Sequence, residues 1–205
     1  MQKENRFIGL KDIVLVTLLT ALCIIICTVA VLPFVANLKL VLWLVSGIEM
    51  LLCGSIYILM CAKAPRAGTQ MLFSFLFAVY YYFTNGMILI SLMVVGVGLV
   101  RELLMLKGGY RSPVRLGAAY ALFGVGVMLA PVVIMISTRE QMVTTMLANG
   151  LTQEYIDTML SVYSVGNILI GVAVTITGAA LGCLMGYRML KKHFAPAGIV
   201  EGAKA

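Results

Sequence analysis

The chain has 205 residues, of which 62% are hydrophobic and 11% are charged, and its mean hydropathy is +1.06. An ordinary soluble domain carries about 25% charged residues, so this composition excludes one and predicts a protein that folds in a lipid bilayer. The net charge of +7 does not indicate a nucleic-acid partner, because the basic residues lie in short segments between apolar runs, where membrane topology explains them.

The apolar runs predict an all-α, polytopic membrane protein with six transmembrane helices, since about 20 apolar residues cross a hydrocarbon core. We expect the spans at about residues 12–33, 41–62, 67–83, 87–105, 116–136 and 164–189, in one domain over residues 1–205. The third and fourth come from one long run, which would make a helix of about 50 Å, too long for a single crossing. The Thr84-Asn85-Gly86 turn signal divides it.

The distribution of basic residues predicts the orientation. With six spans and a cytoplasmic amino terminus, thirteen of the fifteen lysines and arginines fall on the inner side, and only Lys39 and Arg139 fall outside. The positive-inside rule therefore favours six spans with both termini cytoplasmic. The amino-terminal run from Ile13 to Phe34 is too long for a signal-peptide core, so we expect it to be a retained helix.

Two stripes of small residues are candidate helix-packing faces. Gly178, Gly182 and Gly186 are four apart in the last span and form a flat ridge on which another helix backbone can lie closely. Thr17 and Ala21 form a similar face in the first span.

The segment 137–163, between the fifth and sixth spans, is longer than a connector needs. Ser137 with Glu140 matches a capping box, and Thr152 precedes a second helix start. We expect two short amphipathic helices around Asn149-Gly150, which could act as an outer lid.

Glu49 is the one carboxylate deep in a predicted span. Such a residue suggests a ligand contact, a proton relay or an ion site. A hydrogen bond to a neighbouring helix would explain it equally well. Its place in the outer half of the second span favours a cavity that opens outward.

Several other outer-side residues are candidate ligand contacts. Trp43 fits an interfacial anchor, and the tyrosines around Tyr81 fit an aromatic belt, although one ring facing inward could stack on a ligand. Arg139 and Asn167 could orient an anionic or amide-bearing ligand, although an exposed arginine is more often a solvated charge. The remaining candidates are Asn85 and Tyr163.

No residue pattern indicates catalysis or a metal site. The sequence has no nucleophile motif, no paired carboxylates at helical spacing and no phosphate-binding loop after a strand. The five cysteines lie in or beside apolar runs and favour packing roles. The fourteen methionines favour an adaptable apolar surface over haem ligation. We therefore expect no enzyme, no intrinsic cofactor and no metal.

The chain resembles the Trep-Strep family of hydrophobic bacterial membrane proteins, and through it the substrate-binding S components of energy-coupling factor (ECF) transporters. The resemblance covers nearly the whole chain and rests on the small-residue face at residues 16–21, the turns at 61–68 and 106–112, and above all the basic segment 189–200. Thr17 stands where S components usually carry alanine.

The resemblance implies a bacterial cytoplasmic-membrane protein that binds a vitamin or cofactor precursor outside, with haem-like molecules also open. It implies a transmembrane coupling subunit and two ATPase subunits as partners, and delivery of the ligand by reorientation in the bilayer. Thr17, Ala21, Gly178, Gly182 and Gly186 are then candidates for docking on the coupling subunit. The alternative is a self-contained secondary transporter or channel that uses Glu49 as its coupling site.

Overall fold

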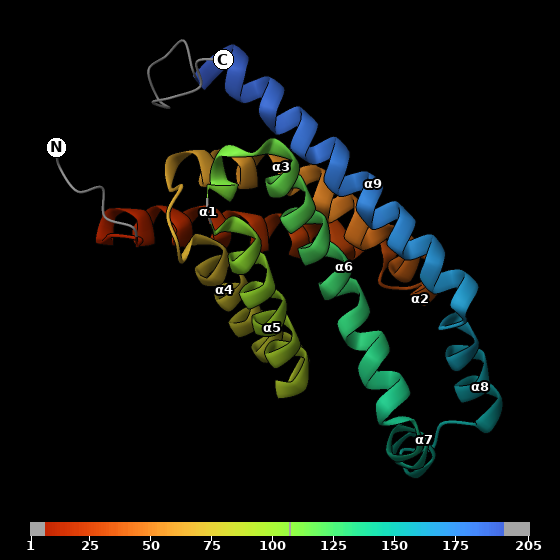
Figure 1. Ribbon diagram of the computed structural model, residues 1–205. Coiled ribbons are helices and arrows are strands. Elements are labelled where there is room, and N and C mark those ends of the chain that lie inside the picture. The colour runs from red at the N-terminus through yellow and green to blue at the C-terminus, as the bar shows by residue number, and fades with distance from the viewer. Residues whose placement is uncertain (1–6, 107, 195–205) are drawn as a thin grey trace, which may run out of the picture.

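The computed structural model describes residues 7–106 and 108–194, which are almost entirely helical and contain no strand (Figure 1). The α-helices are α1 Leu10–Val31, α2 Leu38–Leu40, α3 Ser46–Lys63, α4 Thr69–Asn85, α5 Ile88–Met105, α6 Pro113–Ser137, α7 Arg139–Ala148, α8 Gln153–Val162 and α9 Val165–Met189. A five-residue π-helix, Val41–Val45, joins α2 to α3, and another, Leu190–Phe194, follows α9. The predicted all-α class is confirmed for these residues.

Five helical stretches of the described chain are long and apolar enough to cross a membrane. They are Leu10–Phe34, Leu38–Lys63, Ile88–Met105, Pro113–Ser137 and Val165–Lys192. The predicted third span corresponds to α4, which is apolar but has 17 residues. The division between α4 and α5 lies at Gly86, whose φ of 67° closes the helix, as the turn signal predicted.

The loops predicted to share the cytoplasmic side come together at one end of the bundle. The amide of Ile8, before α1, donates to the carbonyl of Ala67, between α3 and α4, at 3.1 Å. Arg66 forms an ion pair of 2.5 Å with Asp12 in the first turn of α1. The segment 137–163 lies at the far end of α6 and α9 (Figure 1). The contacts between the start of α1 and the end of α3 show that these two helices run in opposite directions.

Glu102 ties the end of α5 to the start of α4. Its carboxylate accepts the backbone amides of Gly68, Gln70 and Met71 at 2.9, 3.1 and 3.2 Å. These amides belong to the first turn of α4, where N–H groups lack partners within the helix and the helix dipole favours negative charge. A carboxylate from a different helix therefore caps α4 and fixes the α4–α5 pair.

The glycine ridge of α9 packs on α3 of the same chain. A Cβ atom at Gly178 would collide with the carbonyl of Gly47, and one at Gly182 would lie 2.5 Å from the carbonyl of Met50. Farther along both helices, a Cβ atom at Gly186 would lie 2.9 Å from the Cα of Ser55. The two helices therefore run parallel with their backbones in contact.

This packing corrects one part of the sequence interpretation. The ridge formed by Gly178, Gly182 and Gly186 does receive a helix, but all three glycines are buried inside the bundle. They are not accessible to a second subunit, and we exclude them from the docking face.

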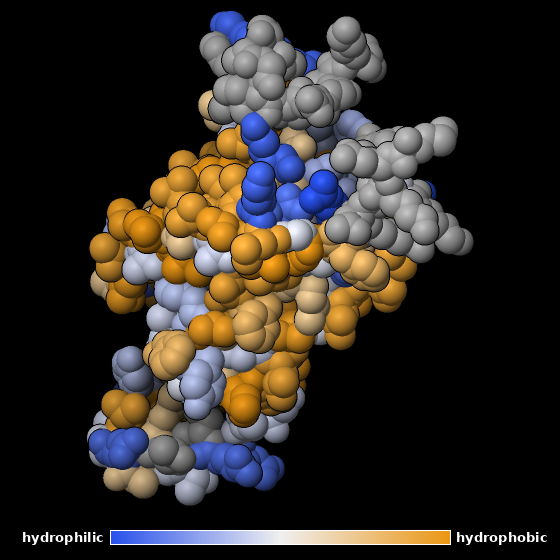
Figure 2. All heavy atoms as spheres, turned by 90° about the vertical axis from the view of Figure 1, so that its left-hand side faces the viewer, coloured by the Kyte–Doolittle hydropathy of each residue, from blue (hydrophilic) through white to orange (hydrophobic). Residues whose placement is uncertain are grey.

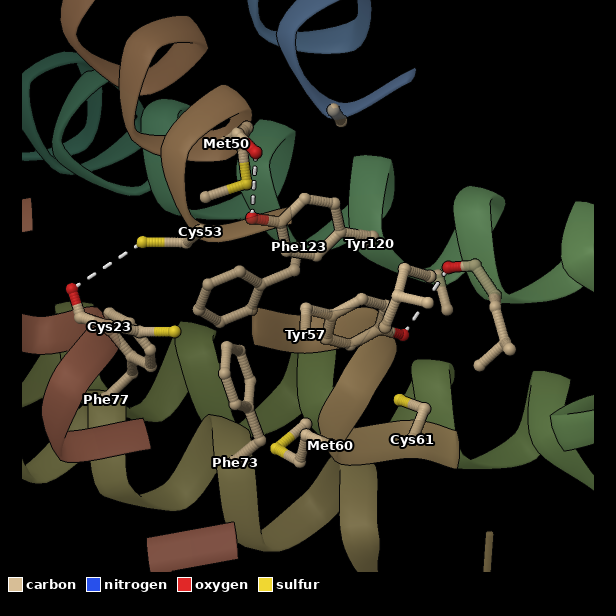
Figure 3. Packing of buried hydrophobic residues seen from close by; sticks show 14 of the residues in the cluster. Cys23, Met50, Cys53, Tyr57, Met60, Cys61, Phe73, Phe77, Tyr120 and Phe123 are labelled. Carbon is tan, nitrogen blue, oxygen red and sulfur yellow. Dashed lines mark hydrogen bonds between the residues drawn. The ribbon is translucent and has the colours of Figure 1, made fainter. Parts of the chain in front are cut away.

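Aromatic side chains from α3, α4 and α6 fill the centre of the bundle (Figure 3). Tyr57 stacks on Tyr120 with ring centroids 4.4 Å apart, and Phe73 contacts Phe123 edge-on at 5.0 Å. Tyr120 donates to the carbonyl of Met50 at 3.0 Å, which satisfies its hydroxyl in this apolar interior.

The outside of the bundle is apolar where a bilayer would surround it. Figure 2 shows hydrophobic surface across the middle of the molecule, and hydrophilic residues at the lower end, where α7 lies. Leucine, isoleucine and valine side chains of α1, α5 and α9 are exposed along these helices. Exposed apolar area of this extent is typical of a lipid-facing surface.

Candidate functional site

A pocket of about 370 Å³ lies where α6, α7 and α8 meet. It is lined by Met135, Ile136, Arg139, Asp157, Leu160, Ser161 and Tyr163. Met135 and Ile136 come from the last turn of α6, and Arg139 begins α7. The pocket is therefore built largely by the segment that the sequence predicted as two short outer helices.

Local sequence explains how α8 supplies one wall. The hydroxyl of Thr152 accepts the amide of Tyr155 at 3.3 Å and starts α8, which confirms the predicted cap. Asp157, Leu160 and Ser161 follow at helical spacing and share one face. The break between α7 and α8 falls at Asn149-Gly150, where Gly150 has a φ of 84°.

The other predicted cap is wrong. The hydroxyl of Ser137 donates to the carbonyl of Val133 at 2.8 Å, and Ser137 is the last residue of α6. Ser137 extends α6 instead of starting α7, because the apolar run of α6 continues to Ile136. Its hydroxyl therefore bonds back to the preceding turn of α6.

Arg139 and Asp157 place opposite charges on the pocket wall without forming an ion pair; the ion pair seen among the described residues is Arg66–Asp12. One oxygen of Asp157, Oδ1, accepts the side-chain amide of Gln153 at 3.0 Å. Burial raises the pKa of Tyr163, so its phenol stays protonated and able to donate. The pocket thus presents a cation, a carboxylate and hydroxyl groups beside apolar side chains.

Glu49 lies elsewhere, buried in the first turn of α3. It shares a helix face with Cys53, whose Sγ lies 3.7 Å from that of Cys27 on α1. Within the described chain its carboxyl makes neither a hydrogen bond nor an ion pair. The interpretation of Glu49 as a hydrogen-bonded link between helices therefore gains no support.

Trp43 lies in the π-helix Val41–Val45, with the ammonium of Lys39 over its ring at 4.6 Å from the centroid. Its indole Nε1 is buried and has no partner in the described part of the chain. Tyr81, near the end of α4, packs against Phe77 and Tyr80. Neither Trp43 nor Tyr81 lines the pocket beside α8.

Asn167 and Asn85 are the remaining candidates. Asn167 donates its side-chain amide to the carbonyl of Val162 at 2.8 Å, so it holds the turn between α8 and α9. Asn85 ends α4, and its side chain lies outside what the structure describes. Among the candidate ligand contacts whose side chains the structure describes, Arg139 and Tyr163 are the two that meet at one cavity.

Arg101 was counted among the inner-side basic residues, near the end of the expected span 87–105. It lies inside α5, is fully buried, and donates to Ser74 at 2.7 Å and to Gln70 at 2.6 Å. Its guanidinium carbon lies 4.6 Å from the ring centroid of Phe123 and 5.1 Å from that of Phe73. Neutral oxygens and aromatic faces therefore solvate this charge.

The burial of Arg101 could have been predicted from its position within the apolar run of residues 87–105, because charged residues inside a span face the bundle interior.

The small-residue face of α1, formed by Thr17 and Ala21, is accessible enough for another subunit to dock on it. Thr17 is half-buried and Ala21 is exposed, among exposed side chains that include Val14 and Leu18. Thr20, by contrast, is buried and donates to the carbonyl of Val16 at 2.6 Å.

Together these features define a polytopic α-helical membrane protein with a small pocket at one end of its bundle. A family model described as a hypothetical bacterial integral membrane protein (Trep_Strep) matches residues 10–195, and the chain belongs to this family. No curated protein and no solved structure matches the chain significantly. Among the described residues, no group of histidine, cysteine and acidic side chains could hold a metal ion.

Proposed function

We propose that this protein is the substrate-binding S component of an ECF-type importer in the bacterial cytoplasmic membrane. It binds a small molecule from outside, docks on a transmembrane coupling subunit with two ATPase subunits, and delivers the ligand by reorienting in the bilayer. The observation that carries the proposal is the pocket of about 370 Å³, which two short helices build at one end of a small, lipid-exposed bundle.

The arrangement of loops supports the orientation that we propose, with six crossings and both termini in the cytoplasm. The loops with most of the basic residues gather at the end opposite the pocket. The 17 residues of α4 span about 26 Å at 1.5 Å per residue, within the lower range for a crossing helix. The pocket then faces the outside of the cell.

Short loops and few charges also support reorientation, since each polar group drawn through lipid costs free energy. The exposed face around Ala21 would meet the coupling subunit, because small side chains allow another helix to approach closely.

Co-purification and uptake measurements test the proposal. The tagged chain, expressed with a coupling subunit and two ATPases, should co-purify with them and support uptake that requires ATP hydrolysis. If the purified chain, alone in liposomes, accumulates its solute along an ion gradient, the proposal is wrong.

A self-contained carrier is the second candidate, and the buried carboxyl of Glu49 favours it, because an unpaired carboxyl within a span suits a proton or ion relay. The same liposome assay decides, with Glu49→Gln as the variant that should abolish ion-coupled uptake if this candidate is correct.

A further inference from the structure

The size of the pocket limits its ligand. Small-molecule sites range from about 300 to 1,000 Å³, so a cavity of about 370 Å³ belongs at the small end. This favours a solute of amino-acid size over a haem-sized or other large flat cofactor.

The charges on the wall limit the ligand further. Arg139 and Asp157 both line the pocket but do not pair with each other. Both residues are exposed, so each can meet a charged group of a ligand, and a ligand with a single charge would pair with only one of them. A ligand with both charges satisfies both groups and carries no net charge into the site.

Each group suits one end of such a ligand. The guanidinium of Arg139 can bind a carboxylate through two parallel N–H groups. The Oδ2 atom of Asp157 is available to an ammonium, since Gln153 bonds to Oδ1. The Ser161 hydroxyl already donates to the carbonyl of Thr158 at 2.6 Å, so toward a ligand it acts as an acceptor.

The rest of the wall is apolar and adaptable. Met135, Ile136 and Leu160 surround the space between the charges, and the ring of Tyr163 adds an aromatic surface. An unbranched methionine adjusts to side chains of different shape.

We propose that the pocket binds a zwitterionic, apolar α-amino acid, with its carboxylate on Arg139 and its ammonium on Asp157. The proposal rests on the function proposed above, because it names the solute class that the S component would take up.

The test uses the purified full chain in detergent and four probes: L-leucine, L-methionine, L-phenylalanine and L-tryptophan. At least one should raise the Tm, and its methyl ester, which lacks the carboxylate, and its N-acetyl derivative, which lacks the ammonium, should not. Arg139→Gln and Asp157→Asn should each weaken binding of that amino acid by about tenfold or more, the loss expected for one charge-assisted hydrogen bond.

Glu154→Gln is the matched control for Asp157→Asn, because it removes a carboxylate from the same helix outside the pocket, and it should bind like the unmodified chain. The Tm of each variant without ligand reports its folding. If Arg139→Gln or Asp157→Asn does not fold, Arg139→Lys and Asp157→Glu replace it, and each should still weaken binding.

Three results would overturn the proposal: no probe shifts the Tm, the ester or N-acetyl derivative binds as well as its parent, or the charge-removing variants bind normally. The experiments also distinguish failure of the ligand class from failure of the proposed transporter function. If no amino acid binds but the chain still assembles with a coupling subunit and two ATPases, only the ligand class is wrong. If an amino acid binds but no partners assemble, the transporter assignment is wrong.

Discussion

Arg101 shows how a single charge is accommodated inside this bundle. The guanidinium has two hydrogen-bond acceptors and three aromatic neighbours, and its Nε has no partner within the described residues. Gln70 is shared, because its Oε1 also accepts the hydroxyl of Tyr57 at 3.1 Å. The side chain therefore connects α5 with α4 and, through Gln70, with α3.

This geometry predicts that Arg101→Lys destabilises the protein by about 1–3 kcal/mol, because an ammonium cannot reproduce the planar fork that reaches Ser74 and Gln70 together. The Tm in detergent measures the effect. Arg115→Lys is the control: Arg115 is exposed, and its contact with the carbonyl of Leu106 is long, at 3.5 Å. Equal stability of the two variants would contradict the structural role of Arg101.

At the scale of elements, the parallel contact between α3 and α9 depends on glycine. Gly178→Ala should destabilise the bundle by about 1–3 kcal/mol, because the new methyl group meets the backbone of Gly47 and the helices must separate. Gly166→Ala, at the start of the same helix in open space, should change stability by less than about 0.5 kcal/mol. Thermal unfolding of both variants in one detergent compares them.

The exposed face of α1 carries a second prediction at this scale. Ala21→Trp should abolish ATP-driven uptake and assembly with the coupling subunit, because the bulky ring prevents close approach of another helix. Ligand binding to the isolated chain should persist, since Ala21 is exposed and does not line the pocket. Leu169→Trp, at an exposed position of α9, is the matched control. Equal loss of binding and assembly in Ala21→Trp would refute the docking role.

For the whole molecule, the orientation can be tested with introduced cysteines. The five native cysteines are buried, so a membrane-impermeant maleimide should report on introduced ones. In intact cells, Asn149→Cys, in the exposed turn between α7 and α8, should react, and Lys192→Cys should react only after permeabilisation. Labelling of both positions in intact cells would show that the two ends of α9 do not lie on the proposed sides.

The sequence predicted the helical elements well because a bilayer imposes simple rules. Apolar length, turn residues such as Thr84-Asn85-Gly86 and the bias of basic residues each act locally along the chain. The expected span at 87–105 matches α5, Ile88–Met105, and the two short helices α7 and α8 are divided at the expected break. Part of the basic segment 189–200 lies outside the described residues, so its role stays a prediction.

The sequence by itself determined that this protein folds in a bilayer, where its helices lie along the chain, and that two short helices follow α6, because these features depend on composition and on neighbours along the chain. Only the tertiary structure decided that the glycine ridge of α9 is used by α3, that Arg101 is buried, and that Arg139 meets Asp157 at one pocket. Each of these depends on which helix faces lie against each other. Periodicity shows that a face can pack, but not which partner it meets.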